Sequence, residues 1–182
     1  ELLVSVVPEK LRIELYLEYD KPLLERELTP LRKFLKARAA HKPLHYVLGK
    51  TEFFSLPFLI VEGVFIPRPE TEILVEEVVN YIGRLSSVNE IVAFDVGTGC
   101  GCIAVTFAHS VQNCKVYASD ISSEAIALAK RNAEKNGVGE RGTFFQGDMF
   151  EPFTECGVPK ADVIVSNPPY IAEGDWDSLQ DE

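Results

Sequence analysis

The sequence predicts an α/β protein built on a parallel, doubly wound Rossmann-like sheet, and two observations lead to this prediction. From Glu90 onward, short apolar runs alternate with segments of helical periodicity, which is typical of strand–helix–strand units joined by right-handed crossovers. The first apolar run is followed by a glycine-rich stretch that opens a helix, as ligand-binding loops do. Right-handed crossovers favour the strand order three-two-one-four, which puts the fourth strand at an edge. Because its residues 163–165 are all apolar, as in a central strand, we expect a sheet truncated after its fourth strand.

Composition limits the possible functions. The chain has 182 residues, 46% of them hydrophobic, and a formal net charge of −10. An acidic surface disfavours a duplex nucleic-acid substrate, and no apolar run is long enough to cross a membrane. No metal site is predicted, because the cysteines lack paired ligand spacing. They are expected to be reduced thiols of a cytoplasmic protein: Cys100, Cys102, Cys114 and Cys156.

Helices and a hairpin are predicted in the first third of the chain. Residues 9–20 have helical periodicity, and a second helix is expected to begin with Thr29 as N-cap and Pro30 at its first position. Aromatic and β-branched runs at 51–54 and 58–61 predict a hairpin that turns at Ser55-Leu56-Pro57. We therefore expect three parts: an N-terminal helical region (1–48), a hairpin and linker (49–69), and a ligand-binding domain (70–182).

The linker leads into the larger domain. Pro67 and Pro69 favour an extended segment up to Glu72. A helix with one apolar stripe is expected to follow and to close at Gly83. The alternating elements that come next are predicted as strand 91–96, helix 102–110, strand 115–119, a helix capped by Ser122 and ended at Gly137, strand 143–146 and strand 163–165.

The ends of the predicted strands carry candidate ligand contacts. Gly97, Gly99 and Gly101 lack the spacing of a dinucleotide loop, because the sixth position is Cys102, and suit a small charged ligand. Asp120, at the second strand end, is either a ribose-diol acceptor or a helix cap. The third strand ends in a carboxylate and an apolar side chain that are either a base pocket or a turn acid and a packing residue: Asp148 and Met149.

The fourth strand runs into Ser166-Asn167-Pro168-Pro169-Tyr170. Two prolines make this loop stiff. The Asn167 side-chain oxygen and the Pro168 carbonyl can accept the two protons of a planar amino group, with Tyr170 as a wall against its plane. The alternative is a proline loop without chemistry.

These motifs resemble known families. The run Asp95–Gly101 is similar to the first motif of class I S-adenosylmethionine-dependent methyltransferases, and Asn167–Tyr170 is similar to the motif of enzymes that methylate amino groups. Ile66–Glu72, with Pro43–Gly49 and Glu52-Phe53, resembles the HemK/PrmC family of peptide chain release factor N5-glutamine methyltransferases. That family's sheet resembles a seven-stranded one, so further strands are expected beyond Glu182.

The resemblance implies S-adenosylmethionine as cofactor and a release factor as protein substrate. It implies catalytic roles for Asn167, Pro168 and Tyr170, and substrate contacts along Asn167–Tyr170, including Pro169. The implied cofactor contacts are Asp95, Gly97, Thr98, Gly99, Cys100, Gly101, Asp120, Ile121, Asp148, Met149 and Asn167.

Three functions stay open from the sequence. The first is methylation of a glutamine amide nitrogen in a release factor, by direct displacement at a clamped nitrogen. The second is N6-adenine methylation of DNA or RNA, which shares the Asn167–Tyr170 motif but should come with a basic surface. The third is a cofactor-binding fragment without activity of its own, an alternative that the expected truncation raises.

Overall fold

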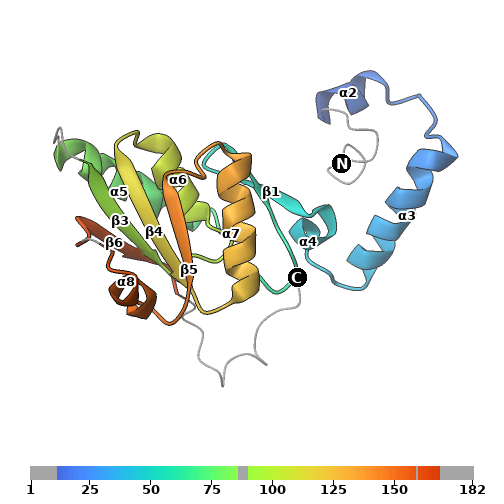
Figure 1. The fold of residues 1–182 in the computed structure, drawn as a ribbon. Coiled ribbons are helices and arrows are strands. Elements are labelled where there is room, and N and C mark those ends of the chain that lie inside the picture. Colours follow the sequence, from blue (N-terminus) through green and yellow to red (C-terminus); the bar gives the residue numbers. More distant parts are fainter. Residues whose placement is uncertain (1–11, 86–89, 159, 169–182) are drawn as a thin grey trace. The chain divides into compact units, whose positions relative to one another are not determined.

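A computed structural model describes residues 12–85, 90–158 and 160–168 (Figure 1). The chain divides into two compact units, the first ending at Gly49 and the second beginning at Lys50. The first unit contains helices α2 (Arg12–Leu17), α3 (Glu25–Ala39) and α4 (Leu44–Leu48). The second contains β1 (Lys50–Phe53), β2 (Leu56–Leu59), α5 (Glu70–Leu85), β3 (Ile91–Val96), α6 (Cys102–Ser110), β4 (Cys114–Asp120), α7 (Ser123–Lys135), β5 (Gly142–Gln146), α8 (Glu151–Glu155) and β6 (Val163–Ser166).

The larger sheet has the strand order β5-β4-β3-β6, and all of its strands are parallel (Figure 1). The chain runs outward from β3 through β4 to β5 and then returns to place β6 on the other side of β3. The strand order therefore reverses between β3 and β6, which is where doubly wound sheets bind ligands. Within the described ranges β6 pairs with β3 alone, and Ile164 is 56% exposed, so the predicted edge position of this strand is confirmed.

Both faces of the sheet are covered, as the continuous apolar character of β3 predicts. All six residues of β3 are buried. Alternate side chains, including Phe94, pack on one face against Tyr117 and against Phe153 of α8. Asp95 points to the other face, where it contacts the first turn of α6. The central strands β3 and β4 are thus largely buried, whereas β5 and β6 on either side of them are partly exposed.

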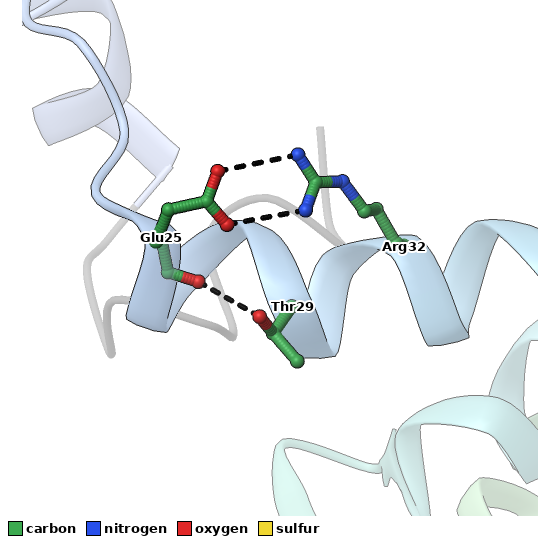
Figure 2. A network of polar contacts seen from close by, with 3 residues as sticks. All are labelled: Glu25, Thr29 and Arg32. Carbon is green, nitrogen blue, oxygen red and sulfur yellow. Dashed lines mark hydrogen bonds and ion pairs between the residues drawn. The ribbon is translucent and has the colours of Figure 1, made fainter.

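Helix α3 begins earlier than predicted. It starts at Glu25, so Thr29 and Pro30 lie inside the helix and not at its N-terminus. Figure 2 shows two contacts of its first turns: the Thr29 hydroxyl donates to the Glu25 carbonyl at 2.9 Å, and Arg32 pairs with the Glu25 carboxylate at 3.1 Å. Glu27 accepts the backbone N–H that precedes the helix. Two acidic residues in the first turn also interact favourably with the helix dipole. Pro30 lacks a backbone N–H, so it removes one helical hydrogen bond.

Other boundaries differ from the predictions for local reasons. Helix α2 ends at Leu17, three residues early, and α5 already begins at Glu70 and continues through Gly83 to Leu85. Gly83 does not end α5, because its backbone does not adopt the left-handed conformation of a C-terminal cap. Gly137, after α7, does adopt it, with a φ of 70°. The hairpin turns at Phe54-Ser55, where both φ angles are positive, as a two-residue hairpin turn requires. The short helices α4 and α8 were not predicted.

Two expectations from composition can be compared with the structure. The four cysteines form no disulfide with one another, and three of them are buried; their reduced state stays a prediction. None of the helices in the described ranges has the length and hydropathy of a membrane span.

A buried asparagine fastens the hairpin to the sheet domain. Asn132 lies on α7, is fully buried, and accepts the Leu59 N–H at 2.7 Å while donating to the Leu59 carbonyl at 3.1 Å. The same side chain donates to the Cys100 carbonyl at 2.8 Å. One amide therefore satisfies three backbone groups that would otherwise be buried without partners.

Replacing Asn132 should destabilise the protein strongly. Asn132→Leu keeps the size of the side chain but leaves three backbone groups unpaired, so we expect a loss of about 3 kcal/mol in the free energy of unfolding, measured by urea denaturation. The control is Asn136→Leu, one turn later, whose bond to the Pro57 carbonyl is exposed; its cost should stay under about 1 kcal/mol. Equal costs for the two variants would contradict this account of Asn132.

Candidate functional site

The candidate site follows from the register of the parallel strands. Val96 pairs with both Ser119 and Ser166, and Asp120 pairs with Gln146. The loops that follow the four strands therefore leave the sheet side by side along one edge, over about 14 Å at ordinary strand spacing. From β5 to β6 this edge presents Gly147–Met149, Asp120-Ile121, Gly97–Gly101 and Asn167-Pro168. Pro169 and Tyr170 lie outside the described residues.

The glycine loop is held by its neighbours. The backbone N–H groups of Gly97 and Thr98 both donate to the Ser119 carbonyl, at 2.9 and 3.0 Å. The N–H of Gly99 donates to the Asp120 carboxylate at 2.8 Å. The loop turns through left-handed backbone conformations that glycine adopts without strain, with φ angles of 74°, 56° and 83° at Gly97, Gly99 and Gly101.

Asp95 holds this loop through buried hydrogen bonds. One carboxylate oxygen accepts from the Thr98 hydroxyl at 2.6 Å and from the Ala104 N–H at 3.1 Å, so it joins the loop to the first turn of α6. The side chain is fully buried, and its second oxygen is buried without a hydrogen-bond partner among the described residues. Burial raises the pKa of Asp95 to about 6, the nearby Asp120 adds to the rise, and the two hydrogen bonds oppose it.

Apolar side chains are exposed beside the acidic strand ends. Ile121 is 74% exposed and Met149 is 58% exposed. Their two loops are joined, because the Gly147 N–H donates to the Asp120 carbonyl at 3.0 Å. The backbone of Met149 has a strained φ of 42°, and the buried Ser119 hydroxyl donates to its carbonyl at 2.7 Å. Exposed apolar groups next to a carboxylate suit a ligand that has both a flat apolar part and hydroxyl groups.

Asp120 already has two partners. Besides the Gly99 N–H, its carboxylate accepts the Ser122 N–H at 3.0 Å, ahead of α7. The helix cap itself is Ser122, whose hydroxyl accepts from Ala125, as predicted. A carboxylate has about four lone-pair positions, so the two contacts leave room for a diol, and the ligand role of Asp120 stays a prediction.

Asn167 and Pro168 are exposed where the fourth strand ends, next to the glycine loop. The Ser166 hydroxyl donates to the Val96 carbonyl at 2.7 Å and holds this strand end against β3. The Asn167 side-chain nitrogen donates to the Thr71 hydroxyl at 3.0 Å, 96 positions away in the sequence. The structure thus brings together the loops of β3 and β6, which the sequence motifs had singled out separately.

Sequence reasoning assigned no individual site role to three residues of this region, although two of them lie in the segment Ile66–Glu72 that carries the family resemblance. Thr71 contacts Asn167, and its neighbour Glu72 accepts the Phe54 N–H at the hairpin turn, at 2.8 Å. Asn132 joins the hairpin to the carbonyl of Cys100 in the glycine loop. The available signals were a hydroxyl and an acid in the proline-rich linker, and an asparagine in the otherwise apolar stripe of a helix.

Two family models match the chain. The methyltransferase small domain matches residues 69–179, and the PrmC N-terminal domain matches residues 1–49. The chain is similar to the release factor glutamine methyltransferase of Chlorobaculum tepidum, with 38% identity over 100% of this chain and 63% of the relative. It is also 43% identical to that of Geobacter sulfurreducens, over 94% of this chain and 57% of the relative.

Solved structures show the same fold. The N-terminal domain of human METTL16 in complex with SAH has a TM-score of 0.54 and 23% identity, over 66% of this chain and 49% of that one. A SAM-dependent methyltransferase from Agrobacterium tumefaciens has a TM-score of 0.53 and 19% identity, over 66% of this chain and 39% of that one. The predicted Rossmann-like α/β fold is therefore confirmed.

The buried carboxylate predicts a particular pH dependence of stability. Because the pKa of Asp95 is higher in the folded state than the usual 3.8, folding favours its protonated form. Stability should therefore fall as pH rises from about 4 to about 6, by up to about 3 kcal/mol. Asp95→Asn lacks this titration, so its stability relative to the native protein should rise over the same interval.

Urea unfolding of both proteins between pH 4 and pH 7.5 measures this difference. The exposed Asp148→Asn is the control for a loss of formal charge. Parallel stability profiles for the native protein and Asp95→Asn would show that Asp95 does not titrate as inferred.

Proposed function

This chain belongs to the methyltransferase small domain family, as a relative of the release factor glutamine methyltransferases, and we propose that it methylates a glutamine side-chain amide nitrogen in a peptide chain release factor. The resemblance to the HemK/PrmC family is thereby confirmed. The chain spans less than two thirds of the length of the curated relatives it matches.

The observation that carries the proposal is the line of four strand ends. We infer that S-adenosylmethionine lies along it and supplies an electrophilic methyl group when bound. Ile121 and Met149 offer apolar surface for a base, Asp120 has acceptor capacity for a diol, and the loop of Gly97–Gly101 allows close approach of a ligand. The remaining residues of the inferred set, Asp95, Thr98, Cys100 and Asp148, support the loop or lie next to it.

We propose that Asn167 and Pro168 present the substrate nitrogen. An amide nitrogen is a poor nucleophile because its lone pair is delocalised into the carbonyl. Two acceptors, the Asn167 side-chain oxygen and the Pro168 carbonyl, would hold both N–H groups, favour a pyramidal nitrogen and stabilise its developing positive charge. The wall proposed for Tyr170 and the substrate contact proposed for Pro169 fall outside the described residues.

The alternative of N6-adenine methylation would use the same Asn167 and Pro168 clamp. The protein substrate is favoured by the matching relatives, which are named release factor glutamine methyltransferases. It is also favoured by the net charge of −10, which repels the phosphate backbone of a nucleic acid. We further propose that the enzyme works in the cytoplasm, where release factors act and thiols stay reduced, and that residues 1–48 and 49–69 serve as a helical region and a linker to the methyltransferase domain 70–182.

The direct test offers the purified protein a choice of substrates. The protein is incubated with methyl-labelled S-adenosylmethionine and either a release factor or adenine-containing DNA and RNA. We expect label on a release factor glutamine. Label on adenine would favour the alternative, and calorimetric binding of the cofactor without transfer to either substrate would indicate a fragment that binds but does not catalyse.

Asn167→Ala should remove turnover while cofactor binding is retained. The hydrogen bond from the substrate to Asn167 strengthens as charge develops on the nitrogen, so we expect kcat to fall about a hundredfold or more. The dissociation constant of S-adenosylmethionine, measured by calorimetry, should change little. A variant with native kcat would refute the proposed role of Asn167.

Asp120→Ala should weaken S-adenosylmethionine binding by about 1.5–3 kcal/mol, the range for hydrogen bonds to a charged group. Titration calorimetry measures the effect, and Glu124→Ala, which removes an exposed carboxylate in the first turn of α7, is the matched control. Native affinity in Asp120→Ala would leave this residue with a structural role in the loop alone.

A further inference from the structure

From the contact between the first turn of α5 and the end of β6, we infer that Thr71 is a positioning residue that fixes the orientation of the Asn167 amide. This inference rests on the proposed function for its kinetic consequences, whereas the contact itself can be tested without any substrate. Thr71 touches no reacting atom in this scheme. It acts through Asn167.

The two side chains differ in a way that suits this role. Thr71 is 6% exposed and lies in the first turn of α5, where its backbone N–H donates to the Arg68 carbonyl at 3.0 Å. Asn167 is exposed at the end of β6. A buried hydroxyl on a rigid helix therefore holds an amide that would otherwise rotate freely in water.

The polarity of the contact decides which amide atom remains available. The Asn167 nitrogen donates to the Thr71 hydroxyl at 3.0 Å, so the amide oxygen is left to accept from a ligand. If the Asn167 amide were rotated by 180°, it would instead present two N–H donors to the ligand. Donors cannot accept the protons of an amino group. A hydrogen bond of ordinary net strength raises the population of the Asn167 rotamer that reaches Thr71 by about fivefold to tenfold.

The first turn of α5 is itself held in place by hydrogen bonds. Glu72, next to Thr71, accepts the Phe54 N–H of the hairpin turn at 2.8 Å, and the Glu72 N–H donates to the Pro69 carbonyl at 3.0 Å. The Thr71 hydroxyl thus has a fixed position relative to the second unit of the protein. This gives the Arg68-Pro69-Glu70-Thr71-Glu72 segment a role that a simple spacer between hairpin and helix would not have.

The first test observes the Asn167 side-chain NH2 by proton–nitrogen NMR, with its signals assigned by their loss in Asn167→Ala. Thr71→Val, which keeps the shape but removes the hydroxyl, should shift these signals and speed their exchange with water. Thr71→Ser should restore them. The control is Thr106→Val, which removes another buried hydroxyl, one bonded within α6, and should leave the Asn167 signals unchanged.

The second test is kinetic. Thr71→Val should lower kcat about tenfold or more, because small misplacements of a positioned group cost rate, while the affinity for S-adenosylmethionine stays native. Thr71→Ser should recover most of the loss, and thermal unfolding checks that all variants are folded. Unchanged Asn167 signals or an unchanged kcat in Thr71→Val would overturn the inference. NMR shifts in a protein that methylates no release factor would support the contact and count against the proposed function.

Discussion

The candidate site depends on one constraint, the hydrogen-bonded register of β3 with its two neighbours. Val96 stands opposite Ser119 on one side and Ser166 on the other, so the glycine loop, the acidic loop and the asparagine loop start at the same level. A shift of one residue in either pairing would turn each side chain of the shifted strand to the other face. The apolar cover of both faces prevents such a shift, and the fold thereby sets the position of the site.

Buried polar groups then connect the loops at this end of the sheet to the segments around them. Asp95 joins the glycine loop to α6, and Asn132 joins that loop to the hairpin. Thr71 joins the first turn of α5 to Asn167. A buried polar group is costly when it lacks a partner, and these side chains instead satisfy specific backbone and side-chain groups. The result is a site whose loops are held by buried hydrogen bonds on the side that faces the protein, while their solvent-exposed side remains available to ligands.

The sheet could be predicted from the sequence because its signals are local. Residues 91–96 form an apolar run interrupted by Asp95 alone, residues 102–110 follow the glycine loop, and Ser122 is a strong capping residue. These elements lie where they were expected. The start of α3 was missed because an acidic first turn outweighed the proline signal. The contacts of Asn132 and Thr71 span 73 and 96 positions, and no periodicity encodes a pairing at such a distance.

The strained backbone of Met149 shows how far the site is determined by its surroundings. A positive φ on a residue other than glycine costs about 1–3 kcal/mol and persists when neighbouring contacts over-determine it. Here the Ser119 hydroxyl holds the Met149 carbonyl, and Ser119 also accepts the first two N–H groups of the glycine loop through its own carbonyl. One buried serine therefore positions both the loop and the exposed apolar side chain, so a ligand that lies across them contacts two surfaces fixed by the same residue.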